Sequence, residues 1–323
     1  MAKAIRIHAP GGPEAMVHED VDVGSPGPGQ ALVRQTAIGV NFIDVYHRSG
    51  AYPLAMPHGI GMEGAGIVEA IGAGVTEVAV GDRVAYAAGP PGSYAEQRVI
   101  NAAVLTKPPA GIPDEIAASI MLQGMTTRYL LKETYVVKPG DWVLVQAAAG
   151  GVGLMLCQWA KHLGAHVIGT VSTDAKAELA KAHGCDFPVV YTREDFVARA
   201  KELTQGNGVA VAYDGVGKDT FLKSLECLGV RGYLVSFGAA SGVPDPLPVP
   251  ALAAKSSFLT RPTLFQYIAK REALLANATD VFEAVTTGFL KIEPPRRYAL
   301  KDAAQAHRDL EGRKTTGSII LVP

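Results

Sequence analysis

The sequence is poor in cysteine, with Cys157, Cys185 and Cys227 as the only three among 323 residues. Their odd number and the absence of any C-x-x-C spacing exclude a disulfide framework and a four-cysteine zinc cluster. Free thiols are typical of a reducing compartment, so we expect a cytoplasmic protein. The N-terminal stretch also lacks the apolar run of a signal peptide, because Lys3, Arg6 and a Pro-Gly-Gly break interrupt it.

The chain has no excess of charge of either sign: 30 Lys and Arg stand against 31 Asp and Glu, a net charge of -1. Without a basic excess we do not expect nucleic acid or an anionic membrane as the main partner. One uncharged stretch, residues 142–160, is long enough to imitate a membrane span. Gly150, Gly151 and Gly153 divide it into a strand, a turn and a helix, so we expect no membrane segment.

The hydrophobic content, 48% of residues, is ample for a core, and the 36 glycines suggest many tight turns. Between residues 141 and 238 a short apolar run, a turn and a helix-period segment follow one another repeatedly. We expect strands at 142–146, 166–171, 209–213 and 233–237, and helices at 152–163 and 175–182 that end at Gly164 and Gly184. Continuously apolar strands are typical of a doubly wound parallel sheet, the Rossmann type.

The first 120 residues differ, because short β-rich runs such as 67–71 and 83–87 alternate with glycine and proline turns. This pattern predicts mostly antiparallel β structure. The segment after about residue 263 is too small to fold alone, so we expect it to return to that region. The fold class is therefore α/β, with a Rossmann domain at 123–262 inserted in a mostly antiparallel β domain formed by 1–122 and 263–323.

Two glycine motifs compete as a phosphate-binding loop. Gly59, Gly61 and Gly64 form a literal G-x-G-x-x-G, but no strand precedes them and β-rich sequence follows, so we regard them as a decoy. Ala148, Gly150 and Gly153 have the same spacing between an apolar strand and a helix. Small residues there allow backbone to approach a pyrophosphate at a helix N-terminus.

The end of the second strand indicates which dinucleotide binds. A carboxylate that would pair with the ribose hydroxyl of NAD is replaced by Ser172 and Thr173, and Lys176 follows in the first helical turn. Hydroxyl groups and a lysine match a 2′-phosphate, so NADPH is favoured over NADH. Asp174 is at the opening of the next helix, where we expect it to cap the N-terminus.

Six segments together resemble the zinc-free quinone oxidoreductases of the medium-chain dehydrogenase/reductase superfamily, also called zeta-crystallin-like, over essentially the whole chain. They are GVNFIDVYHRSGAYP from residue 39, GMEGAGIVEAIGAGVTEVAVGDRVAY from 61, GSYAEQ from 92, LQGMTTRYLL from 122, QAAAGGVG from 146 and SFGAASG from 236. The resemblance implies that the discontinuous domain is GroES-like and catalytic. Zinc-dependent relatives carry cysteine where Asn41 stands and histidine where Met62 stands, so we expect no metal.

The resemblance also implies the site residues. The expected cofactor contacts are Asn41 near the nicotinamide, Gln123, Thr127 and Tyr129 at the domain junction, Gly150, Gly151 and Val152 at the pyrophosphate, Ser172 and Lys176 at the 2′-phosphate, Tyr191 near the adenosine, and Phe237, Gly238 and Arg261 further along. Tyr46 and Tyr52 would line the acceptor pocket or else serve only as packing aromatics. Asp44 would orient this catalytic cluster or merely cap a helix.

The expected activity is hydride transfer from NADPH to a quinone in the cleft between the domains, without metal. An NADPH-dependent enone reductase would use the same site. A non-catalytic NADPH-binding or RNA-binding protein is the alternative from another class, and the balanced charge argues against RNA. The resemblance further implies a homodimer formed through the edge strand near Tyr233–Phe237.

Overall fold

The computed structural model describes residues 1–323 and divides into two units. Unit 1 comprises Met1–Met125, Ile268–Thr286 and Ile292–Pro323, and unit 2 comprises Thr126–Tyr267 and Thr287–Lys291. The sequence predicts boundaries after residues 122 and 262, a few residues before those of the structure, which follow Met125 and Tyr267. The short segment Thr287–Lys291, in which the chain returns to unit 2, was not expected. Side-chain contacts explain that return, because Phe289 stacks on His162 and the Gln158 amide donates to the Lys291 carbonyl.

Unit 2 is built on one six-stranded sheet whose paired strands all run parallel. The strands are β8 (Trp142–Val145), β9 (His166–Val171), β10 (Phe187–Val190), β11 (Val209–Asp214), β12 (Leu228–Ser236) and β13 (Phe258–Thr260), in the spatial order β10-β9-β8-β11-β12-β13. This is the strand order of the doubly wound dinucleotide-binding fold. The expectation of a Rossmann sheet is therefore confirmed.

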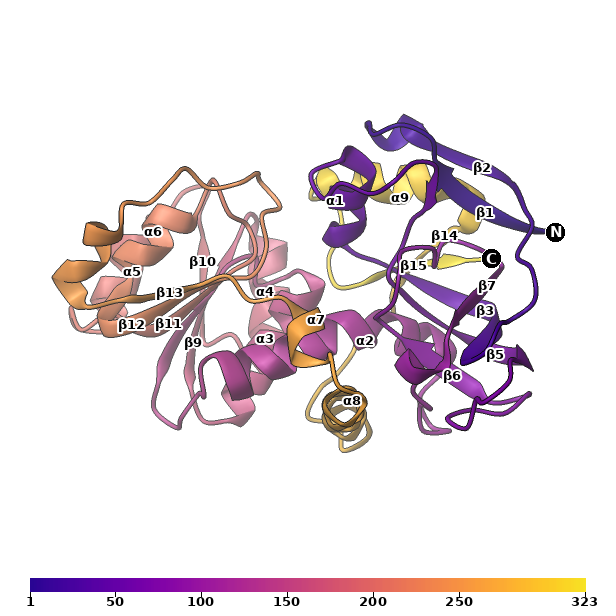
Figure 1. Cartoon of the computed structure of the whole chain (residues 1–323). Helices are drawn as coiled ribbons and strands as arrows, with labels where there is room; N and C mark the ends of the chain where they lie inside the picture. The colour runs from indigo at the N-terminus through magenta and orange to yellow at the C-terminus, as the bar shows by residue number, and fades with distance from the viewer. The chain divides into compact units, whose positions relative to one another are not determined.

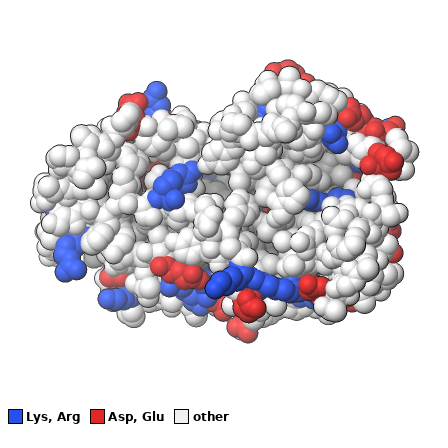
Figure 2. Space-filling view, in the orientation of Figure 1, with Lys and Arg blue, Asp and Glu red and all other residues white.

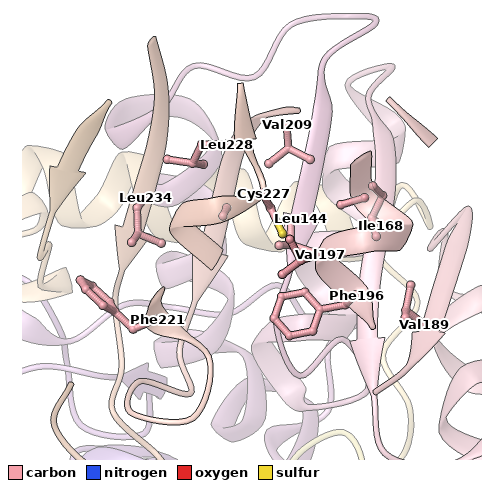
Figure 3. Packing of buried hydrophobic residues seen from close by; sticks show 12 residues of the cluster. Leu144, Ile168, Val189, Phe196, Val197, Val209, Phe221, Cys227, Leu228 and Leu234 are labelled. Atoms are coloured by element: carbon pink, nitrogen blue, oxygen red, sulfur yellow. The ribbon is translucent and has the colours of Figure 1, made fainter. Parts of the chain in front are cut away.

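Helices pack against this sheet and bury its apolar side chains. They are α3 (Gly151–His162), α4 (Asp174–Ala182), α5 (Phe196–Leu203) and α6 (Phe221–Glu226). Unit 2 also contains α7 (Leu264–Tyr267), a π-helical turn at Leu130–Thr134 and a 3-10 segment at Val249–Lys255. Figure 3 shows the core between α5, α6 and the strands, where Phe196 and Val197 meet Leu144 and Ile168. Gly164 and Gly184 have φ of 87°, the left-handed conformation expected where these helices end.

The expectation that Tyr233–Phe237 forms a sheet edge is wrong. Tyr233, Leu234 and Val235 pair in parallel with Phe258–Thr260, so β13 covers β12 and is itself the edge strand. Three residues that follow a proline-rich segment give no recognisable strand pattern by themselves. Pairing with β12 is what makes them a strand.

Unit 1 consists of two sheets that are antiparallel except for the pair β14 and β15. The smaller sheet contains β2 (Met16–Val21), β1 (Ala2–Ile7) and β4 (His58–Gly59) in this order. The larger contains β14 (Arg296–Ala299), β15 (Ile319–Val322), β3 (Gln30–Val40), β5 (Glu63–Ile71) and β6 (Arg83–Tyr86), with β7 (Gln97–Asn101) also on β3. Figure 1 shows β15, from the yellow C-terminal segment, beside β3 from the indigo N-terminal part.

The helices of unit 1 are α1 (Phe42–Ser49), α8 (Arg271–Thr286) and α9 (Ala303–Glu311), with 3-10 turns at Pro13–Ala15, Ala102–Val104 and Leu300–Asp302. Helix α2 (Asp114–Tyr129) contains the boundary between the two units. No helix in the chain combines the length and the apolar character that crossing a membrane requires. In Figure 2 the charged side chains form small groups of both signs, without a broad field of one sign on this face.

Candidate cofactor and active site

The loop after β8 has the features of a phosphate-binding turn. Ala147 has φ of 53°, and Gly150 precedes α3 as an N-cap without a side-chain hydrogen bond. The first-turn N–H groups of a helix have no acceptor within the helix, and here no side chain caps them. A Cβ on Gly153 would overlap the Ala147 carbonyl, so glycine is required where α3 meets β8. Gly151 and Val152 therefore present backbone N–H groups suited to an anion, while the Gly150 N–H donates to the Ala147 carbonyl at 2.9 Å.

The other glycine motif serves packing. Gly61 has φ of 94°, and a Cβ there would overlap the Tyr94 ring. A Cβ on Gly64 would overlap Oε1 of Gln35, and Gly64 lies within β5 rather than before a helix. The expectation that β structure rather than a helix follows this motif is therefore confirmed.

The ends of β9 and β10 bring Ser172, Lys176 and Tyr191 to one region. Lys176 lies in the first turn of α4, the Thr192 hydroxyl donates to the Ser172 carbonyl at 3.2 Å, and the Tyr191 N–H donates to the Val171 carbonyl at 3.0 Å. These are three of the expected cofactor residues, and their backbone positions place them along the carboxyl end of β9.

Asp174 does not cap α4, contrary to our expectation. The Thr173 hydroxyl oxygen accepts the Lys176 N–H instead, at 3.3 Å. The Asp174 carboxylate pairs with Arg193, whose guanidinium lowers the pKa of that carboxyl. Arg193 thus lies beside the residues expected at the 2′-phosphate, with its charge paired with that of Asp174, and the sequence pattern did not single it out.

The ends of β12 and β13 place Phe237, Gly238 and Arg261 together. A Cβ on Gly238 would lie 2.5 Å from the Gly215 carbonyl oxygen, and Nη1 of Arg261 donates to the Ser236 carbonyl at 3.0 Å. These residues lie at the carboxyl edge of the same parallel sheet as the Gly150 loop, where doubly wound folds bind their ligands.

In unit 1, Asn41 is the centre of a buried polar cluster. Its Nδ2 donates to Oε2 of Glu63 at 2.8 Å, and its Oδ1 accepts from Nε2 of Gln123 at 3.2 Å. Its backbone N–H donates to Oδ2 of Asp44 at 2.8 Å, across the first turn of α1. The structure thus brings Asn41, Asp44 and Gln123 together, and Asp44 both orients Asn41 and stabilises the start of α1.

Glu63 is the member of this cluster that sequence reasoning missed. Glu63 and Asp44 are both fully buried. Burial raises the pKa of Glu63 to about 8, although the Asn41 amide and the Leu122 N–H lower it, and the charge of Asp44 raises it further. Burial likewise raises the pKa of Asp44 to about 7, against hydrogen bonds from Asn41 and Tyr94. A carboxylate within the glycine-rich strand that follows Met62 was the available sequence signal.

A second chain of hydrogen bonds ends at Asp44. The Tyr94 hydroxyl donates to Oδ2 of Asp44 at 2.9 Å and lies 3.0 Å from Nε2 of His307. Nη1 of Arg48 lies 2.9 Å from Nδ1 of His307. Because arginine only donates, His307 accepts at Nδ1 and carries its proton on Nε2, which donates to Tyr94. Burial and the charge of Arg48 lower the pKa of His307 to about 3.

The remaining expected residues divide between the units. Tyr46 and Tyr52 pack together with ring centroids 5.1 Å apart, and Tyr52 is 41% exposed. Thr127 and Tyr129 lie in the part of α2 that belongs to unit 2, where Tyr129 stacks on Tyr267. Around Asn41 and Met62, as elsewhere in the chain, no three His, Cys, Asp or Glu side chains are grouped so that they could hold a metal ion.

Comparison with known proteins gives matches over the whole chain. Residues 27–114 match the alcohol dehydrogenase GroES-like domain and residues 151–279 match the zinc-binding dehydrogenase family. A quinone oxidoreductase of Pseudomonas aeruginosa is 49% identical, and a 2-haloacrylate reductase of a Burkholderia species is 47% identical. Each alignment covers 100% of this chain, and 100% and 99% of the respective relative.

The structural comparison gives the same result. The crystal structure of Escherichia coli quinone oxidoreductase complexed with NADPH superposes with a TM-score of 0.98 at 44% identity, covering 100% of both chains. That relative was therefore crystallised with the cofactor that Ser172 and Lys176 predict for this chain.

Proposed function

The chain belongs to the quinone oxidoreductases of the medium-chain dehydrogenase/reductase superfamily, and from this premise we propose that it is an enzyme that reduces a quinone with NADPH. One observation carries the proposal: a full-length relative of nearly identical fold was crystallised with NADPH. The helix N-terminus at Gly150 and the group at Ser172 supply this chain with sites for a pyrophosphate and a 2′-phosphate.

Bound NADPH supplies the hydride, and the protein residues bind and orient the two reactants. In our proposal the N–H groups of Gly151 and Val152 hold the pyrophosphate. Ser172 and Lys176 hold the 2′-phosphate, and Tyr191 lies beside the adenosine. The other cofactor contacts that we propose are Asn41, Gln123, Thr127, Tyr129, Phe237, Gly238 and Arg261.

On the acceptor side we propose that Tyr46, in α1, and Tyr52, just after α1, line the quinone site, since their rings pack together. Asp44 acts through Asn41, because its buried carboxyl accepts the Asn41 N–H. A quinone that has accepted hydride becomes a hydroquinone anion and takes its proton from water. No side chain has to serve as the proton donor.

The reaction in this proposal needs no zinc. Asn41 and Met62 occupy the positions where zinc-dependent relatives carry ligands, and neither amide nor thioether is a good ligand for Zn²⁺. Elemental analysis should find no stoichiometric zinc, and quinone reduction should persist in chelator. One tightly held zinc per chain, with activity lost on its removal, would contradict this assignment.

The direct test is quinone-dependent oxidation of NADPH by the purified protein, with 1,4-benzoquinone and 9,10-phenanthrenequinone as acceptors. We expect turnover with NADPH and much weaker turnover with NADH. The control is the Gly150→Val variant, in which a side chain blocks the approach of the pyrophosphate. If wild type and Gly150→Val oxidise NADPH equally slowly with every quinone, the proposal is wrong.

A second candidate, reduction of electron-poor alkenes, is favoured by one observation: the relative that is 47% identical is a 2-haloacrylate reductase. The same assay with an enone and with 2-chloroacrylate distinguishes the two activities. A kcat/KM for an alkene well above those for both quinones would make alkene reduction the main activity.

We further propose a cytoplasmic homodimer. All three cysteines are free and buried, which suits a reducing compartment. The edge strand β13 exposes Phe258 and Leu259, 43% and 40% of their surface, beside an unpaired backbone edge. Two such edges can pair about a twofold axis and so extend the sheet across both subunits.

A further inference from the structure

A continuous chain of hydrogen bonds runs through Glu63, Asn41, Gln123 and Ser318. Nδ2 of Asn41 donates to Oε2 of Glu63, and Nε2 of Gln123 donates to Oδ1 of Asn41. The Ser318 hydroxyl lies 2.8 Å from Oε1 of Gln123 and 3.3 Å from the Ser119 carbonyl, so it can donate to either. All four side chains of the chain are buried.

This chain has a direction, and the direction can be reversed. As the structure shows it, Ser318 donates to Gln123, Gln123 to Asn41, and Asn41 to the Glu63 carboxylate. Turning an amide by 180° about its last bond exchanges its donor and acceptor ends with almost no change of shape. With both amides turned, Asn41 donates to Gln123, Gln123 donates to the Ser318 oxygen, and Ser318 donates to the Ser119 carbonyl. The end of Asn41 that faces Glu63 is then an oxygen, which needs a donor.

Only a protonated Glu63 supplies that donor. An ionised carboxyl only accepts, whereas a protonated carboxyl carries one O–H. Oε1 of Glu63 accepts the Leu122 N–H at 2.8 Å, so the proton belongs on Oε2, which faces Asn41. We propose that Glu63 is a positioning residue whose protonation sets which end of the Asn41 amide donates and which end accepts.

The surroundings of Glu63 make this proton available near neutral pH. The carboxyl is fully buried, and burial raises its pKa to about 8. The charged group that acts on it is Asp44 from α1, which disfavours a second charge, and Tyr94 is the other titratable group nearby. The Glu63 carboxyl accepts hydrogen bonds from backbone N–H groups of α2. On the side of β3 it packs against Gly39, where a Cβ would overlap Oε2 of Glu63.

The consequence for catalysis rests on the proposed function. A quinone or enone carbonyl only accepts hydrogen bonds, so it distinguishes the N–H end of Asn41 from the oxygen end. Reversal of the chain gains or removes one neutral hydrogen bond to such an acceptor. We therefore expect kcat/KM for the quinone to differ about 2-fold to 10-fold between the two plateaus of its pH profile, with a midpoint near pH 8.

The decisive variant is Glu63→Gln. Its Oε1 still has to accept the Leu122 N–H, which leaves Nε2 as a permanent donor toward Asn41. The variant therefore fixes the reversed direction at every pH. Gln123→Glu is the second variant. Its carboxylate attracts Nδ2 of Asn41 toward residue 123, which leaves the Asn41 oxygen facing Glu63 and favours protonated Glu63. The midpoint of the pH titration should therefore rise. Glu69→Gln, on the same strand but at the surface, is the matched control.

The experiment follows the side-chain amide signals of Asn41 and Gln123 by ¹⁵N NMR from pH 6 to pH 9.5, beside the pH profile of kcat/KM. We expect both signals to titrate near pH 8 in wild type and in Glu69→Gln. In Glu63→Gln they should stay at the low-pH position, and its kcat/KM should remain at the low-pH plateau of wild type. Amide signals that do not titrate in wild type, or that titrate equally in Glu63→Gln, would overturn the proposal.

The two readouts separate the proposals. If wild type reduces no quinone at any pH, the proposed function fails, while the NMR titration still decides the role of Glu63. If wild type is active and the amides titrate, but kcat/KM follows the same pH profile in wild type and Glu63→Gln, Glu63 does not position Asn41 for the reaction and our proposal is wrong.

Discussion

The buried carboxyls of unit 1 predict that the protein loses stability as the pH rises from about 6 to about 8. In the unfolded chain Asp and Glu have pKa values near 4 and hold no proton above about pH 6. In the native protein burial raises the pKa of Asp44 to about 7 and that of Glu63 to about 8. The native state therefore binds more protons than the unfolded state. These extra protons stabilise the folded protein, and this stabilisation is lost as the pH rises through the native pKa values.

Two histidines act in the opposite sense at lower pH. Burial lowers the pKa of His47 to about 4 and that of His307 to about 3, so both are neutral where the unfolded chain still protonates them. Below about pH 6 the unfolded state gains nearly as many protons on these histidines as the native state holds on the two carboxyls. We expect stability to change little there and to fall mainly between about pH 6 and pH 8.

The size of the fall follows from proton linkage. Each proton that the native state holds in excess changes the free energy of unfolding by ~1.4 kcal/mol per pH unit. Near pH 7 the excess is about one proton, because the two carboxyls retain more than one proton between them and the unfolded histidines take up part of the difference. Over the whole interval the free energy of unfolding should decrease by roughly 2 kcal/mol.

Urea unfolding at constant ionic strength, from pH 5 to pH 8.5, measures this dependence. Asp44→Asn removes one titrating carboxyl, while its Oδ1 can accept the Asn41 and Tyr94 hydrogen bonds in place of the carboxylate oxygen. The fall between pH 6 and pH 8 should then become clearly smaller, whereas Glu69→Gln should follow wild type. A wild-type stability that stays constant or increases over this interval would refute the linkage between these carboxyls and folding.

Three further predictions concern the cofactor site and the assembly. Gly150→Val should fold, since a Cβ there meets only the Ala147 carbonyl oxygen at 3.3 Å. Calorimetric titration should nevertheless show NADPH affinity at least about 10-fold weaker than in wild type. The control Gly111→Ala, with open space around its Cβ, should bind NADPH like wild type. Lys176→Ala should weaken NADPH binding by about 10-fold to 150-fold and leave NADH binding nearly unchanged, and equal weakening of both would mean that Lys176 does not contact the 2′-phosphate. Leu259→Lys on the edge of β13 should convert dimers to monomers in sedimentation experiments, whereas the exposed Val80→Lys should not, and a Leu259→Lys dimer of wild-type stability would place the interface elsewhere.

Local patterns were sufficient to predict most of unit 2. The strand at 166–171 is found with the expected bounds, and those at 142–146 and 209–213 differ by one residue. These strands are recognisable because both faces of the sheet are buried and each run is continuously apolar. β10 is only four residues long and contains Pro188, and β13 has three residues, so neither shows such a run. Both become strands through their pairing with a longer neighbour.

The resemblance identified Asn41, Asp44 and Gln123, but not the residues that orient them. Glu63, Tyr94 and His307 belong to the cluster through hydrogen bonds that span 22 to 213 positions of the sequence. A histidine on the helix α9 carries no local sign that it reaches a tyrosine from the loop before β7. The predicted cap at Asp174 was wrong by one position, because α4 begins at Asp174 and its N-cap is Thr173, whose hydroxyl oxygen accepts the Lys176 N–H. The pairing of Asp174 with Arg193, 19 residues later, carried no local sign either.

The two units use different kinds of groups, which determines how each responds to a change of conditions. At the Gly150 loop the groups that we propose to hold the pyrophosphate are backbone N–H groups, whose donor character does not depend on pH. Around Asn41 the direction of each hydrogen bond between side chains depends on groups that can turn or titrate. The pKa values of Asp44 and Glu63, about 7 and about 8, lie close to neutrality. A change of pH near neutrality should therefore act on how the acceptor is oriented rather than on how the pyrophosphate is held. The pH sensitivity of Asp44 is reduced by Tyr94, whose hydroxyl donates to the carboxyl, favours its ionised form, and in turn hydrogen-bonds to His307. Glu63 has only the Asn41 amide and backbone N–H groups to stabilise its charge.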